Sequence, residues 1–143
     1  MLLHMLFFQL PRVPEWLLQA GDYYFLKRIL RRQPVRPGAF TAEDVARYQQ
    51  ALAQPGARTA ALNYYRAARR FRRAVSGSRR VISVPTLLIW GERDPYLGVR
   101  LTQGLEERVP HLQIERLPNA SHWVQNDAPE EVNRLLLRFL AAD

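Results

Sequence analysis

Two polar residues in the second half of the chain have the side-chain types that acid–base catalysis needs. Asp94 follows the apolar segment 86–90, and His122 follows the segment 112–117. If both segments are neighbouring parallel strands, their carboxyl ends lie about 4.8 Å apart and the two side chains can meet. An Asp bonded to one ring nitrogen of a His fixes the imidazole tautomer, so the other nitrogen can take a proton. The pair predicts a catalytic acid and base, although either residue alone is also typical of a turn or loop.

The elements that must position this pair have the order of an α/β sheet. Segment 86–90 is a continuous apolar run, which favours a strand buried on both faces, and segment 112–117 is a second strand candidate. Apolar spacing predicts a helix over 97–108, and Pro129 opens a final helix. The order strand, helix, strand, helix indicates the α/β class. Because two strands alone do not make a stable covered sheet, we expect part of the sheet to be missing from this sequence.

The first half of the chain is predicted to be helical. Prolines, capping residues and apolar spacing predict helices that begin at Pro14, at Asp22 (ending at Arg32), at Thr41 and at residue 58 (ending at 74). The Ser-Gly-Ser stretch at 76–78 marks a boundary between residues 1–78 and residues 79–143.

The net charge of +8 over 143 residues is unevenly distributed. Residues 1–80 carry 15 Lys/Arg against four Asp/Glu, whereas residues 81–143 have a net charge of −3. Clustered Arg can form a phosphate-binding surface, but it is also typical of a solvated helix face. No RNA- or DNA-binding motif accompanies the cluster, so the solvated face is the favoured interpretation and nucleic acid is not an expected partner.

Composition excludes several other kinds of site. The sequence has no Cys, which rules out disulfides, thiolate zinc sites and a Cys nucleophile, and its three His are scattered. We expect no metal site and no cofactor. The apolar first ten residues are too short for a membrane span and lack the features of a signal peptide, so the expectation is a cytoplasmic protein without membrane contact.

Four motifs resemble one known family. The segments Pro-Thr-Leu-Leu-Ile-Trp-Gly-Glu-Arg-Asp (85–94) and Pro-Asn-Ala-Ser-His-Trp-Val-Gln (118–125) resemble the carboxyl-terminal third of an α/β-hydrolase of the epoxide hydrolase and haloalkane dehalogenase branch. Phe-Phe-Gln-Leu-Pro (7–11) and Leu-Asn-Tyr-Tyr-Arg (62–66) are similar to parts of the epoxide hydrolase lid. The resemblance implies a partial α/β-hydrolase fold, in which a helical lid (1–78) precedes the last two strands and helices of the parallel sheet (79–143).

The resemblance also implies roles for single residues. Asp94 would be the acid of a catalytic triad, His122 the base that activates water, and Tyr65 a lid tyrosine whose hydroxyl donates to the epoxide oxygen. Phe8 and Trp123 would line the substrate pocket. The implied substrate is a small apolar epoxide or a related electrophile.

Two departures from the family pattern leave alternatives open. The sequence has no strand-to-helix elbow with an Asp or Ser nucleophile and no oxyanion loop, so we expect a fragment that is inactive alone and is completed by a separate amino-terminal half. His4 stands where the family has its first lid tyrosine, so the resemblance implies that it binds the substrate, although a His in a frayed terminus is the favoured interpretation for this fragment. A related dehalogenase lid uses a His and a Trp near this place to hold halide. A haloalkane or haloacid dehalogenase, an Arg-rich binding module without catalysis, and a non-functional remnant remain alternatives.

Overall fold

The chain folds into two compact units. The computed structural model describes residues 6–75 and 81–141, without the side chains of 69–75. One unit comprises Met1–Arg32 and Phe40–Ser78, and the other comprises Gln33–Ala39 and Arg79–Asp143. The short segment 33–39 therefore belongs to the second unit, although in sequence it lies among the helices of the first. The division of the chain into a lid and a core stays a prediction.

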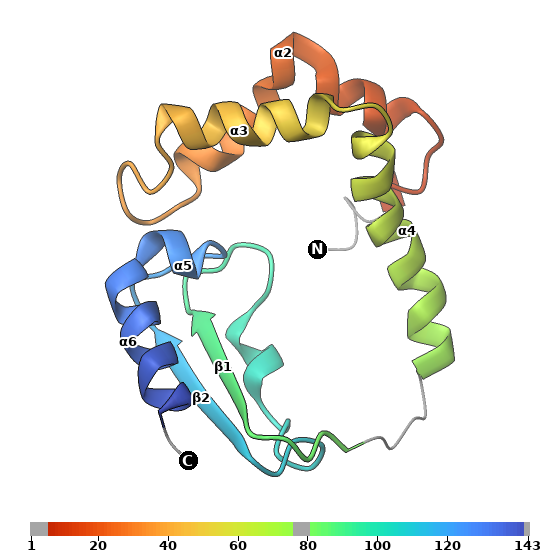
Figure 1. Cartoon of the computed structure of the whole chain (residues 1–143). Helices are drawn as coiled ribbons and strands as arrows, with labels where there is room; N and C mark the ends of the chain where they lie inside the picture. The colour runs from red at the N-terminus through yellow and green to blue at the C-terminus, as the bar shows by residue number, and fades with distance from the viewer. Residues whose placement is uncertain (1–5, 76–80, 142–143) are drawn as a thin grey trace. The chain divides into compact units, whose positions relative to one another are not determined.

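Figure 1 shows the helices and strands of both units. In chain order they are α2 (Val13–Arg32), α3 (Ala42–Ala53), α4 (Ala57–Val75), β1 (Thr86–Gly91), the 3-10 helix η1 (Val99–Thr102), β2 (Leu112–Leu117), α5 (Val124–Asp127) and α6 (Pro129–Leu140). Within the described residues, none of the helices is long and apolar enough to cross a membrane.

Helix α2 is two helices joined by a kink, and the prediction that Asp22 caps the second of them is wrong. Gly21, Asp22 and Tyr23 have φ values of 58°, 54° and 62°, which lie in the left-handed region. The Asp22 carboxylate bonds Lys27 Nζ at 2.5 Å and accepts from Gln49 Nε2 at 2.6 Å. Its oxygens thus hold side chains beyond the kink and on α3, where a capping residue would bind the amides of its own helix.

Helices α3 and α4 begin close to the predicted positions. The Thr41 hydroxyl accepts from the Asp44 amide at 3.1 Å while the Asp44 carboxylate accepts from the Thr41 amide at 2.9 Å, which is a complete capping box. The Asp44 carboxylate also accepts from the Thr41 hydroxyl at 2.7 Å, and this bond, together with the one from the Thr41 amide, holds the pKa of Asp44 below its usual value. Helix α2 packs against both α3 and α4. The buried apolar side chains of this unit include Tyr23, Leu30, Phe40, Val45 and Leu62.

The two predicted strands are confirmed and pair in parallel. β1 and β2 form a two-stranded sheet in which Thr86 lies opposite Leu112 and Gly91 opposite Leu117. Because the register is one to one, the two carboxyl ends lie side by side. Residues 86–90 are only half-buried, in contrast to the predicted strand covered on both faces. In the described part of the chain, each strand has only one strand neighbour, so each leaves one edge unpaired.

The predicted helix over 97–108 is wrong. The structure has one short 3-10 turn, η1, followed by turns that lead into β2. Gly104 adopts a φ of 67°, a conformation that ends a helix and that other residues rarely take. The Leu spacing of this segment does not mark a buried helix face, because Leu101 is exposed while Leu97 and Leu105 are half-buried.

Helix α6 starts at Pro129, as predicted, and packs against β1. Val132 and Leu135 form its buried side. The short helix α5 precedes it and contacts both α6 and β1. These packed elements support the loop that carries His122.

Gly91, the last residue of β1, lies against the backbone of the loop that follows β2. A Cβ atom at this position would be 2.1 Å from the Ser121 carbonyl oxygen and 2.6 Å from that of Ala120. Nearby, the Arg93 amide donates to the Ala120 carbonyl at 3.0 Å. Only glycine permits this approach, and the approach brings the loops that carry Asp94 and His122 together.

We expect Gly91→Ala to destabilise the second unit by about 2–4 kcal/mol, because both neighbours are backbone atoms that cannot turn away. Urea denaturation monitored by tryptophan fluorescence measures this change. Gly98→Ala is the matched control, because a Cβ there meets nothing within 4 Å. Equal stability of the two variants would contradict the packing role of Gly91.

Candidate active site

Asp94 is held in a fixed orientation by the turn that follows β1. Its Oδ1 accepts from the Tyr96 amide at 2.7 Å and from the Leu97 amide at 2.9 Å. The carboxylate side chain is 7% exposed. The turn interpretation and the catalytic interpretation of Asp94 are therefore compatible, because one oxygen builds the turn and the other remains for a second partner.

That second partner is His122. Asp94 Oδ2 lies 2.8 Å from His122 Nδ1. An anionic acceptor at this distance favours a proton on Nδ1, which leaves the lone pair of Nε2 as the basic site. The imidazole side chain is 37% exposed. Asp94 and His122 are thus brought together across the two strand ends, with one ring nitrogen bound and the ring accessible to water.

Two aromatic rings flank the imidazole. Tyr96 lies edge-on to His122 with ring centroids 5.2 Å apart, and Trp123 lies edge-on at 5.4 Å. Trp123 itself is half-buried. These contacts restrict rotation of the His122 ring and place Trp123 beside it. That Trp123 forms a pocket wall stays a prediction.

Asp127 was not singled out by the sequence, and it is the second carboxylate near His122. It is 6% exposed. Its Oδ2 accepts from the Ser121 amide at 2.7 Å and from the Ser121 hydroxyl at 2.5 Å, and its Oδ1 accepts from the Arg36 amide at 2.9 Å. The bond between Asp127 and the Arg36 amide cannot be predicted from residue spacing, because Arg36 is 91 residues away along the chain.

Tyr65 belongs to the other unit, on α4. Its ring packs against Phe8 with centroids 5.1 Å apart and against Tyr64 at 5.8 Å. Tyr65 is 40% exposed, and among the described residues nothing forms a hydrogen bond with its hydroxyl. The expectation that Tyr65 shares a cavity with Asp94 and His122 stays a prediction, and His4 lies outside the described residues.

Arg66, next to Tyr65, is one of the clustered Arg of residues 1–80, but it has a structural role. Its guanidinium donates to the carbonyl oxygens of Phe8 and Leu10, both at 2.8 Å, and pairs with Glu15 at 2.8 Å. The two charged side chains are only 22% and 17% exposed. Arg66 therefore fastens residues 8–15 to α4, which keeps Phe8 against the Tyr65 ring. The solvated interpretation is wrong for this Arg.

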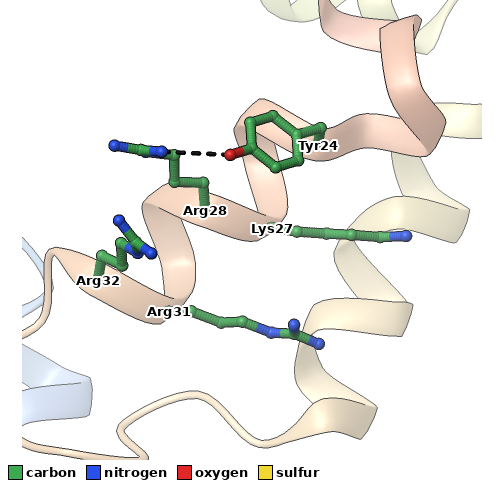
Figure 2. Close-up of a pocket in the computed structure, with 5 residues that line it drawn as sticks. All are labelled: Tyr24, Lys27, Arg28, Arg31 and Arg32. Carbon is green, nitrogen blue, oxygen red and sulfur yellow. Dashed lines mark hydrogen bonds between the residues drawn. The ribbon is translucent and has the colours of Figure 1, made fainter.

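A separate pocket on α2 has a volume of about 280 Å³. Figure 2 shows the side chains that line it. It is lined by Tyr24, Lys27, Arg28, Arg31 and Arg32. Two of its four cations have partners, since Lys27 pairs with Asp22 and Arg28 donates to the Tyr24 hydroxyl at 3.2 Å. Its chemistry suits an anion, but it contains no carboxylate or imidazole. Across residues 6–75 and 81–141, no group of three or more His, Cys, Asp or Glu could hold a metal ion.

Comparisons with known proteins identify the family of the chain. A model of the "Alpha/beta hydrolase family" matches residues 3–135. The chain is 40% identical over 134 residues to the AB hydrolase superfamily protein YfhM of Bacillus subtilis, covering 94% of this chain and 46% of that protein. It is 32% identical over 139 residues to epoxide hydrolase 4 of Mus musculus, covering 94% of this chain and 38% of that protein.

The structure is similar to that of an epoxide hydrolase from Bacillus megaterium in complex with an inhibitor. The TM-score is 0.77 with 28% sequence identity, over 96% of this chain and 50% of that chain. The chain spans less than half the length of the two curated relatives named above. It belongs to the alpha/beta hydrolase family and has a partial α/β-hydrolase fold. Within that family its relatives place it in the epoxide hydrolase branch.

The Arg66–Glu15 pair predicts a dependence of stability on pH. The hydrogen bond from Arg66 lowers the pKa of Glu15 below its usual value of 4.5. Because the folded-state pKa is the lower one, the pair stabilises the fold above about pH 4.5, and this stabilisation is lost as the pH falls through the folded-state pKa. We expect Glu15→Gln to lower the free energy of unfolding by about 1–3 kcal/mol at pH 7 and to weaken its decline in acid.

Urea denaturation at pH 7 and pH 3 measures both effects. Glu43→Gln is the matched control, because the Glu43–Arg47 pair is exposed (73% and 70%) and contributes little to stability. If Glu15→Gln and Glu43→Gln behaved alike at both pH values, the structural role of Arg66 would be wrong.

Proposed function

We propose that this chain supplies the acid–base part of an epoxide hydrolase that converts small apolar epoxides to diols. The observation that carries the proposal is the 2.8 Å contact between Asp94 Oδ2 and His122 Nδ1, with Asp94 fixed by two backbone amides. The family and the named relatives support the hydrolase class. The nucleophile is an Asp from sequence outside these 143 residues, which contain no nucleophile elbow.

The proposed reaction has two steps. In the first, the external Asp carboxylate attacks an epoxide carbon, the carbon–oxygen bond breaks, and the Tyr65 hydroxyl donates to the oxygen that becomes an alkoxide. This step leaves an ester between the nucleophile and the opened substrate. A phenol suits it because its proton is available to a strongly basic alkoxide but is kept at neutral pH.

In the second step, His122 Nε2 takes a proton from water as the water oxygen attacks the ester carbonyl. The ester bond breaks, the diol leaves, and the Asp nucleophile returns as a carboxylate. Asp94 holds the tautomer with a free Nε2 and stabilises the imidazolium that forms. The imidazolium then returns its proton to the departing alkoxide. The second proton of the water leaves the new carboxyl group and restores the Tyr65 hydroxyl, so protons balance over the cycle.

Phe8 and Trp123 are proposed as apolar walls for the substrate, because each packs against a proposed catalytic ring. The proposal requires no cofactor.

A haloalkane or haloacid dehalogenase remains the alternative within the family, since the ester and its hydrolysis are the same and only the leaving group differs. Release of halide from a chloroalkane, against diol from an epoxide, separates the two.

The test of the acid and base uses a hybrid in which residues 1–143 are joined to the half of the Bacillus megaterium enzyme that they do not match. We expect epoxide turnover in this hybrid. Asp94→Asn and His122→Gln should lower turnover by about 10³-fold or more while the alkyl ester still accumulates, because only the second step needs the pair. Mass spectrometry of the trapped protein detects the ester. Normal turnover in both variants would contradict the assignment.

The role of Tyr65 has its own test in the same hybrid. Tyr65→Phe should slow ester formation by about tenfold or more, because the developing alkoxide loses a donor. Tyr64→Phe is the matched control, because Tyr64 is the neighbouring phenol on the same helix and is 76% exposed. Rapid-mixing measurement of the first turnover isolates this step. An equal effect of the two substitutions would exclude a specific role for Tyr65.

A further inference from the structure

The Asp127 carboxylate has no role in the two proposed chemical steps, yet it is buried. Among the side chains that the structure describes, no Lys, Arg or His forms an ion pair with it. Its charge is instead balanced by three hydrogen-bond donors, two of them backbone amides. Burying an anion without a cation costs free energy even when the anion is hydrogen-bonded, so we expect this carboxylate to have a role in the site.

One oxygen of Asp127 organises both chain neighbours of His122. Oδ2 accepts from the amide and the hydroxyl of Ser121, which is 1% exposed. The same hydroxyl oxygen accepts from the Trp123 amide at 3.2 Å. A chain of bonds thus runs from Trp123 through Ser121 to Asp127, and it fixes the backbone on either side of His122.

The other oxygen of Asp127 binds the segment 33–39. Oδ1 accepts from the Arg36 amide, and at the same segment the Tyr96 hydroxyl donates to the side-chain oxygen of Gln33. Tyr96 in turn donates its amide to Asp94 and packs its ring against His122. Both members of the Asp94–His122 pair are therefore linked to segment 33–39, one through Tyr96 and one through Asp127.

We propose that Asp127 is a positioning residue that directs the His122 imidazole toward Asp94 and couples this orientation to segment 33–39. The proposal rests on the proposed function, because it assigns Asp127 to the orientation of the proposed base. Segment 33–39 connects α2 to α3, so the link joins the arrangement of the base to the connection between two helices of the first unit.

The test measures His122 directly, in the 143-residue chain. In Asp127→Asn, the amide nitrogen cannot accept a hydrogen bond, so the bonds to either Ser121 or Arg36 are lost. We expect the Nδ1 proton of His122 to exchange with water about tenfold faster and the ring to populate both tautomers. We also expect faster exchange of the Arg36 amide. NMR of ¹⁵N-labelled protein reports all three, and His111 serves as an internal reference.

Two controls separate positioning from stability. Glu130→Gln makes the same chemical change at an exposed carboxylate nearby, and Val132→Ala destabilises the second unit without touching the network. Both should leave the His122 signals unchanged. The proposal is overturned if folded Asp127→Asn keeps the wild-type tautomer and exchange rate, or if Val132→Ala alters them equally. If Asp127→Asn does not fold, Ser121→Ala decides in the same way, because it removes only the hydroxyl link.

The hybrid enzyme provides the kinetic readout. Asp127→Asn should lower kcat about tenfold, with KM changed less than about twofold, since the base is misdirected while substrate contacts remain. A kcat equal to that of the unsubstituted hybrid would overturn the proposal. If the unsubstituted hybrid opened no epoxide, the proposed function would fail, and the NMR result on the chain would still decide the role of Asp127.

Discussion

The hydrogen bond between Asp94 and His122 depends on a contact between two stretches of backbone. β1 and β2 end level with each other, and Gly91 allows the chain after β1 to lie against the carbonyl groups of Ala120 and Ser121. A side chain at this position would force the two backbone segments apart, because its Cβ atom would lie 2.1 Å from the Ser121 carbonyl oxygen. The distance between Asp94 and His122 therefore depends on Gly91, a residue that has no side chain.

The two acidic residues near His122 are positioned in the same way but have different partners. Each carboxylate accepts hydrogen bonds from backbone amides, so its position is fixed by the main chain. Asp94 then has one oxygen free for the imidazole, whereas Asp127 fastens the loop that carries it. Because main-chain donors are held by the fold, neither carboxylate depends on a flexible Lys or Arg for its orientation.

Much of this arrangement could be predicted from the sequence because the relevant signals are local. A continuous apolar run predicted the strand 86–90, and a rough apolar alternation predicted the strand 112–117. Pro129 and Thr41 predicted two helix starts, and the position of Asp94 and His122 after successive strands predicted their meeting. The prediction of a helix over 97–108 was wrong because leucine spacing alone cannot reveal that Gly104 takes a left-handed conformation. Asp22 failed as a cap because its partners include Gln49, a residue on another helix.

Other features are invisible in the sequence because they depend on burial. Arg66 belongs to a run of arginines that is typical of a solvated surface, and only the folded structure shows its guanidinium bound to Glu15 and to main-chain carbonyls. Asp127 likewise gains its role from Arg36, which is far away along the chain. Such contacts join separate segments, and no periodicity records them.

The placement of segment 33–39 has a consequence for evolution and engineering. The chain leaves the first unit after Arg32, contributes seven residues to the second, and returns at Phe40 before its final passage near residue 78. The helical unit is therefore not a continuous insertion that recombination could exchange at two points. If the helical unit of a relative replaced this one, segment 33–39 would have to stay as it is here. Otherwise the residue that bonds this segment, Asp127, would have to be exchanged with it.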